Sequence, residues 1–238
     1  MVLIGILMEM VLMICMLSTN KELIFKTDFV KNYSKNLFTW QEFEYLINIR
    51  PLLSNKRVKI LDPQKNDYVW YTNGWMKDKN TYPPSLIRSL LDEFVVYFTD
   101  MSRVTKNINK FASNLEDIYQ RHTDAHIYVC RDPNIEHPFA AHFDMQHNVI
   151  VQCEGKTNFK VWKEVEDHII EKKIQLDMSN EKPILDVIME NGDAIWIPRY
   201  YPHQAISLTS RLSVSFPFCD NENSSHEKSF EDRNWVTL

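Results

Sequence analysis

The chain has 238 residues, of which 44% are hydrophobic, 12% aromatic and 25% charged, so it has the composition of a globular protein and not of a disordered or fibrous one. Its net charge of −5, without a basic run, argues against a nucleic-acid partner. Only 4 glycines occur, which excludes the glycine-rich phosphate loops of nucleotide-binding proteins. The cysteines form no Cys-x-x-Cys pair, and we expect buried, free thiols in the reducing environment of the cytoplasm (Cys15, Cys130, Cys153 and Cys219).

Residues 1–18 form an apolar N-terminal segment, interrupted only by Glu9 between Val2 and Met16. The run is shorter than the roughly 20 residues that a spanning helix needs. It also lacks the basic residues that begin a secretory signal. We therefore expect no stable membrane association, and interpret the segment as a packed N-terminal element or as the result of a start codon assigned too early.

Residues 19–122 are predicted to be mostly helical and to buttress a second, β-rich part of the chain. Thr39 and Glu42 have the spacing of a capping box, in which side chain and backbone at a helix start bond reciprocally. Pro51 is expected to end that helix.

A second helix is predicted to begin at Ser85, because the apolar residues after it keep the helical period (Leu86, Ile87, Leu90, Leu91, Phe94, Val95 and Phe98). Ser113 and Glu116 form another possible capping box ahead of a third helix. Core packing is the expected role of all three apolar faces.

Residues 123–218 change in character, because short runs rich in β-branched and aromatic residues replace the helical period. Seven strands are predicted, at 126–130, 148–153, 158–162, 184–189, 194–197, 204–208 and 212–218. Asn191-Gly192 is predicted to form a hairpin turn. So many short strands favour a sandwich or barrel, with a helical insert at 163–175 and a polar C-terminal tail at 219–238.

Two histidines and a carboxylate form the candidate metal site. His142 and Asp144 lie two residues apart, so on a strand their side chains share one face. His203 follows a predicted strand that would bring it to the same end of a barrel. Two imidazoles and one carboxylate on one face of a metal ion leave open positions, as in non-heme Fe(II) oxygenases.

The His-x-Asp pattern is weak by itself, because the chain contains a second copy in His122 and Asp124. Either copy alone is typical of structural or surface residues. The strands and turns that follow His142 favour the first copy as the metal site.

Two segments resemble the metal-binding motifs of JmjC and cupin-like oxygenases. The first is His142-Phe-Asp-Met-Gln-His-Asn-Val-Ile-Val-Gln-Cys-Glu-Gly155, and the second is Gly192-Asp-Ala-Ile-Trp-Ile-Pro-Arg-Tyr-Tyr-Pro-His203. Residues 212–216 resemble the closing strand. The likeness covers roughly residues 120 to 218, with a spacing similar to that of compact bacterial ribosomal-protein hydroxylases.

The resemblance implies a double-stranded β-helix of the cupin or jelly-roll kind, buttressed by the helical N-terminal part. It also implies Fe(II), 2-oxoglutarate as co-substrate and O2. Carried over by position, the metal ligands are His142, Asp144 and His203. Asn148 and Gln152 are expected on the next strand, near the metal and co-substrate.

One position departs from the family pattern. A Lys or Arg is usual two residues after the glycine, where it pairs with the distal carboxylate of 2-oxoglutarate, and here Thr157 occupies that place. Lys156 and Lys160 are close in sequence, but on a regular strand they point away from the face of Thr157.

Arg211 and Ser213 offer a replacement, because Arg-x-Ser after the distal histidine serves this purpose in other 2-oxoglutarate oxygenases. A guanidinium can bond both carboxylate oxygens at once. The alternative is that Arg211 is a solvated turn residue. Tyr128 is expected to add a hydroxyl contact.

The resulting prediction is an Fe(II)- and 2-oxoglutarate-dependent dioxygenase that hydroxylates a protein or peptide side chain. Two alternatives remain open at this point. One is a small-molecule hydroxylase of the same fold, acting on an amino acid or a natural-product intermediate. The other is a non-catalytic cupin-like metal- or ligand-binding protein, which Thr157 favours.

Overall fold

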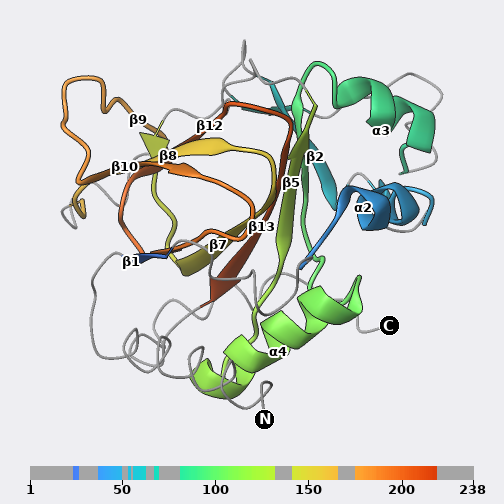
Figure 1. Ribbon diagram of the computed structural model, residues 1–238, viewed down its shortest axis with the longest axis horizontal. Coiled ribbons are helices and arrows are strands. Elements are labelled where there is room, and N and C mark those ends of the chain that lie inside the picture. The colour runs from blue at the N-terminus through green and yellow to red at the C-terminus, as the bar shows by residue number, and fades with distance from the viewer. Residues whose placement is uncertain are drawn as a thin grey trace.

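The computed structural model consists of two β-sheets packed face to face, with helices against the outer face of the larger sheet (Figure 1). It describes residues 24–26, 37–49, 53–54, 56–62, 67–69, 81–131, 141–165 and 175–218. This is the arrangement expected of a double-stranded β-helix.

The large sheet has eight strands in the order β1-β11-β7-β13-β5-β4-β2-β3, and all of its pairings are antiparallel. Its strands in chain order are β1 (Ile24–Lys26), β2 (Val58–Asp62), β3 (Asp67–Val69), β4 (Val95–Phe98), β5 (His126–Cys130), β7 (His147–Glu154), β11 (Ala194–Ile197) and β13 (Arg211–Phe218). Residues far apart in the sequence thus meet along one continuous surface.

The small sheet has five strands in the order β10-β8-β12-β6-β9. They are β6 (Ala141–His142), β8 (Thr157–Val161), β9 (Gln175–Leu176), β10 (Leu185–Met189) and β12 (His203–Ser207). One apolar cluster joins the inner faces of the two sheets, with members from both (Ile150, Phe159, Val161, Met189, Ile195, Ile197 and Ala205). Residues two apart on a strand share a face, so the polar Asn148 and Gln152, two residues on either side of Ile150, also face this interior.

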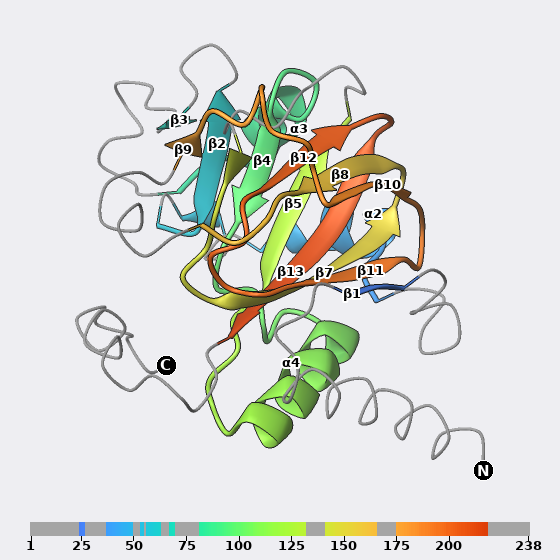
Figure 2. The same ribbon diagram turned by 90° about the vertical axis from the view of Figure 1, so that its left-hand side faces the viewer.

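The helices α2 (Trp40–Leu46), α3 (Pro84–Leu90) and α4 (Lys106–Tyr119) pack in the main hydrophobic core, and Figure 2 shows α4 beneath the large sheet. The Thr105 side chain caps α4 by accepting the Ile108 amide, and Gln120 ends it in the left-handed conformation. Phe111 of α4 packs on Phe216 of β13, with ring centroids 4.4 Å apart. The core on this outer face leaves the inner face free to form a site.

Two helix predictions were wrong. The helix predicted from Ser85 to Phe98 ends at Leu90, and Val95–Phe98 form strand β4. Such a short apolar run fits both periods, and β-branched and aromatic residues buried on both faces favour the strand. The capping box predicted at Ser113 lies inside α4, which begins at Lys106 with Thr105 as its N-cap. Residues 19–122 therefore contribute strands as well as helices.

The strand predictions were confirmed more closely. β5 and β11 have the predicted bounds, and the other five predicted strands differ by one residue at one or both ends. The hairpin predicted at Asn191-Gly192 was wrong in one respect. The turn exists, with φ of 94° at Gly192, but the strands that it joins belong to different sheets.

Several predictions fall outside the described residues: the 1–18 segment, most of the 163–175 insert, the 219–238 tail, and Cys15 and Cys219. Cys130 and Cys153 are free and buried, as predicted. None of the helices in the described part of the chain is long and apolar enough to cross a membrane.

The capping box at α2 provides a test of local helix stability. Thr39 Oγ1 accepts the Glu42 amide at 3.1 Å, and the Glu42 carboxylate accepts the Thr39 amide at 2.9 Å. Thr39→Ala leaves the first amide without this partner, so we expect unfolding free energy to fall by about 1 kcal/mol in urea titrations. Ser89→Ala, which removes an exposed hydroxyl in α3, should change it by less than about 0.5 kcal/mol. Equal losses in the two variants would contradict the capping role.

Candidate metal centre

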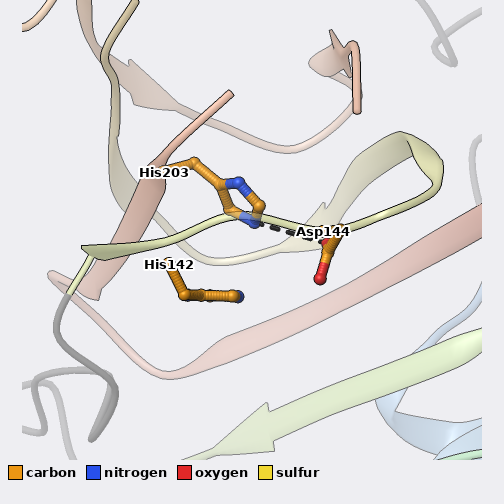
Figure 3. A group of neighbouring side chains, drawn as sticks. All are labelled: His142, Asp144 and His203. Carbon is orange, nitrogen blue, oxygen red and sulfur yellow. Dashed lines mark ion pairs between the residues drawn. The ribbon is translucent and has the colours of Figure 1, made fainter. Parts of the chain in front are cut away.

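His142, Asp144 and His203 converge at one end of the space between the sheets (Figure 3). His142 on β6 and His203 on β12 are direct partners in the antiparallel register. Asp144 follows β6 by two residues and turns back toward them. One ligand atom from each residue lies within 4.8 Å of the others, and His203 Nε2 is 3.6 Å from Asp144 Oδ2.

Neighbouring groups hold these side chains in orientation. His203 Nδ1 lies 3.0 Å from the Tyr201 carbonyl, to which it can donate only as N–H, and this leaves Nε2 to face the other two residues. Asn148 Nδ2 donates to Asp144 Oδ2 at 3.0 Å, and Ser215 Oγ donates to Asn148 Oδ1, the side-chain amide oxygen. The structure thus places Asn148 beside Asp144.

The electrostatics favour an ionised Asp144. Burial acts to raise the pKa of this carboxyl, but His203, His142 and the Asn148 amide together hold it below its ordinary value. An ionised carboxylate beside two imidazole nitrogens is the donor set of a facial-triad Fe(II) site. The residues present therefore fit the metal that the family resemblance implied.

The second His-x-Asp copy does not form such a cluster. His122 Nδ1 lies 2.9 Å from Glu116 Oε1, and the His122 side chain is 54% exposed. Asp124 lies instead beside His126, with 2.9 Å between Oδ2 and Nε2. Of the two copies, the structure brings only His142 and Asp144 together with a further histidine, His203, among the described residues.

Arg211, the first residue of β13, is buried between the sheets and only 2% exposed. The interpretation of Arg211 as a solvated turn residue was therefore wrong. Its Nε donates to Ser213 Oγ at 2.8 Å, and its guanidinium carbon is 5.2 Å from the Tyr128 ring centroid. Burial lowers the pKa of Arg211. Its Nη1 has no hydrogen-bond partner among the described residues. An unpaired buried cationic donor is costly, and an anion bound there would relieve that cost.

Thr157 is fully buried, and its Oγ1 also lacks a hydrogen-bond partner in the described part of the chain. On the small sheet, Thr157 is the register partner of Ser207. On the large sheet, Arg211 is the register partner of Cys130. The Cys130 thiol donates to the Ser207 hydroxyl and so connects the two pairs. These contacts place Thr157 and Arg211 at the same end of the interior, on opposite sheets.

The two lysines point away from Thr157, as the strand alternation predicted. Lys156 Nζ pairs with Glu190 Oε1 at 2.6 Å, and Lys160 lies 4.0 Å from Asp186 Oδ2. Gln152 is buried opposite Ser213 in the register, and its amide donates to the Glu154 carbonyl at 2.8 Å. Arg211 is thus the cation that the described strands bring to this interior end.

The sequence analysis did not predict one hydrogen-bonded group near Arg211. Tyr97, His126 and Asp124 are hydrogen-bonded in series. The Tyr97 ring also packs against the ring of Tyr128, which lies beside Arg211. The available signal was that His126 and Tyr128 alternate on one strand and so share a face. The partner Tyr97 lies on β4, the segment predicted as helix.

Fold and triad together define a class of protein: a double-stranded β-helix with a two-histidine, one-carboxylate metal site. Comparison with protein families identifies the family. Residues 101–225, more than half of the chain, match the JmjC domain family. The chain belongs to this family.

Relatives in the family are larger proteins. The chain is 25% identical over 181 residues to "Bifunctional lysine-specific demethylase and histidyl-hydroxylase NO66" of Dictyostelium discoideum, covering 74% of this chain and 34% of that protein. It is 23% identical over 191 residues to "Ribosomal oxygenase 1" of Danio rerio, covering 77% and 33%. The chain thus spans about a third of the length of these relatives.

A solved structure has the same fold. It is that of YcfD, a ribosomal oxygenase from Escherichia coli, in complex with cobalt and 2-oxoglutarate. The TM-score is 0.59 at 13% identity, covering 91% of this chain and 55% of that one. At this identity the likeness establishes the double-stranded β-helix fold.

Proposed function

We propose that the protein is an Fe(II)- and 2-oxoglutarate-dependent oxygenase that hydroxylates a side chain of a protein or peptide. The observation that carries this proposal is the triad of His142, Asp144 and His203, a donor set suited to Fe(II), inside a JmjC double-stranded β-helix. The relatives support it, because their names describe a histidyl-hydroxylase and ribosomal oxygenases.

The triad would hold the metal through two imidazole nitrogens and one carboxylate oxygen. The bound iron, with 2-oxoglutarate and O2, would supply the oxidising chemistry, which is the cofactor's own. The protein's part is to orient these ligands, through the Tyr201 carbonyl on His203 and the Asn148 amide on Asp144.

Arg211 and Thr157 would bind the distal carboxylate of 2-oxoglutarate. Arg211 Nη1 and Thr157 Oγ1 are buried, lack partners among the described residues, and lie at one end of the interior. A carboxylate has the acceptor oxygens to satisfy both. Ser213 steadies the guanidinium by accepting from its Nε, and Tyr128 covers its face.

A protein substrate is preferred over a small molecule because the named relatives are ribosomal oxygenases. We place the protein in the cytoplasm, where the free thiols of Cys130 and Cys153 would stay reduced.

The first experiment adds Fe(II) and 2-oxoglutarate to the protein without oxygen and records the visible spectrum. We expect the charge-transfer band of a 2-oxoglutarate chelate, and its loss in His142→Ala, which lacks one metal ligand. Metal binding without a band in the wild-type protein would contradict the co-substrate and favour a metal-binding protein without oxygenase activity.

A further inference from the structure

The turn that precedes His203 contains an aromatic residue in a strained conformation. Tyr200 has φ of 68°, in the left-handed region that favours glycine. It is the third residue of a four-residue turn, in which the Tyr201 amide donates to the Pro198 carbonyl at 3.4 Å. The left-handed conformation is unfavourable for any residue with a side chain and rare for a bulky one. Glycine would make this turn without strain, so the turn alone does not account for a tyrosine.

Two other non-glycine residues have positive φ in the described part of the chain, and each has a local reason. Gln120, with φ of 53°, ends α4, where the left-handed conformation is common. Asp100, with φ of 59°, has the short polar side chain that tolerates this conformation. Neither reason applies to Tyr200.

Both backbone polar groups of Tyr200 are hydrogen-bonded. Its amide donates to the Asp144 carbonyl at 2.9 Å, and its carbonyl accepts the Val165 amide at 3.1 Å. The next residue, Tyr201, presents the carbonyl that orients His203 Nδ1. The turn is therefore bonded to two of the three candidate metal ligands, one from each half of the site.

The Tyr200 side chain adds contacts that glycine could not make. Its half-buried ring packs edge to face with Phe143, with centroids 6.2 Å apart. Phe143 is only 6% exposed and lies in sequence between His142 and Asp144. The Arg199 guanidinium carbon lies 5.5 Å from the Tyr200 ring centroid. The ring is thus held between its own turn and the segment that carries two metal ligands.

We infer that Tyr200 is a positioning residue for the metal site, which holds Asp144 in place relative to His203. Its amide bonds to the Asp144 backbone, and its ring packs against Phe143, the residue before. Strained residues persist at functional sites where the surrounding contacts over-determine their conformation. The inference rests on the proposed function, since it needs a metal ion on the triad.

The test measures Mn(II) affinity by calorimetry in three variants of Tyr200. Tyr200→Gly keeps the amide and removes both ring and strain, whereas Tyr200→Ala removes the ring and keeps the strain. Both should bind Mn(II) about 10- to 100-fold more weakly than the wild-type protein, as when a group that orients a metal ligand is lost. Tyr200→Phe keeps the ring and should retain wild-type affinity.

Thermal unfolding of the metal-free variants should follow a different order. Tyr200→Gly should unfold about 2–4 °C above Tyr200→Ala, because glycine adopts the left-handed conformation without strain. Its Mn(II) affinity should nevertheless stay as low as that of Tyr200→Ala. A merely structural role predicts instead that metal affinity recovers together with stability.

Gln120 provides the matched control, because it has the same backbone conformation at an exposed position after α4, beneath the large sheet (Figure 2). Gln120→Gly should also unfold at a higher temperature than Gln120→Ala, and both should keep wild-type Mn(II) affinity. If Tyr200→Ala does not fold, Tyr200→Asn takes its place, because asparagine tolerates the left-handed conformation and lacks the ring. It should bind Mn(II) as weakly as Tyr200→Gly.

The outcomes separate the inference from the proposed function. Wild-type Mn(II) affinity in Tyr200→Gly, or equally weak binding in Tyr200→Phe, would overturn the role of the ring. A Tyr200→Gly variant that is no more stable than Tyr200→Ala would overturn the assignment of strain to Tyr200. A wild-type protein that binds no Mn(II) would overturn the proposed metal site instead.

Discussion

Arg211→Ala is expected to weaken 2-oxoglutarate binding by roughly 30-fold or more while leaving metal affinity unchanged. Truncating one partner of a buried, hydrogen-bonded charge pair costs about 2–5 kcal/mol, and each 1.4 kcal/mol is a factor of about ten. The guanidinium is 2% exposed, and no ion pair with a described carboxylate competes for it. Its removal would leave the co-substrate's distal carboxylate without a cation, whereas the triad is untouched.

The measurement is calorimetric titration of 2-oxoglutarate into the Mn(II)-loaded protein. Arg211→Lys should be intermediate, because it keeps the charge but loses the fork that bonds two carboxylate oxygens. Arg88→Ala is the control, because that side chain is 38% exposed and pairs with Glu44 at the surface. Wild-type affinity in Arg211→Ala would mean that another group holds the carboxylate.

The metal triad could be predicted because its signals are local. His142 and Asp144 are two residues apart, and the strand that delivers His203 is a continuous apolar run after a turn. The inward orientation of Thr157 and outward orientation of Lys156 likewise follow from alternation within one strand. Each of these inferences needs only neighbours in sequence.

Two features depend on pairing between strands that are distant in sequence: the burial of Arg211, and the hydrogen bond between Tyr97 and His126. Arg211 follows a turn, and its burial results from its pairing with Cys130 and from closure by the small sheet. Tyr97 meets His126 only because β4 pairs with β5, and the apolar spacing around Tyr97 also fits a helix. Sequence periodicity assigns residues to faces, but it does not decide which faces meet.

The turn at Gly155 makes a further demand on the sequence, and we expect Gly155→Ala to destabilise the protein by about 3–5 kcal/mol. Gly155 has φ of 79°, and a Cβ built there would lie 1.7 Å from the carbonyl oxygen of Ser210. The left-handed conformation costs about 1–3 kcal/mol for a residue with a side chain, and relieving an overpacked contact about the same again. Thr209 Oγ1 accepts the Lys156 amide at 2.8 Å, so this turn is bonded to the one before β13.

Thermal unfolding distinguishes the two causes. Asn accepts the left-handed conformation more readily than Ala, so Gly155→Asn would recover most of the stability if φ alone mattered. We expect it to be nearly as unstable as Gly155→Ala, because it carries the same Cβ against the Ser210 carbonyl. Lys156→Ala, which loses only a surface ion pair in the same turn, should cost less than about 1 kcal/mol. A side chain at position 155 would displace Ser210, which directly precedes Arg211. We therefore expect weaker 2-oxoglutarate binding, together with the loss of stability, in both Gly155 variants but not in Lys156→Ala.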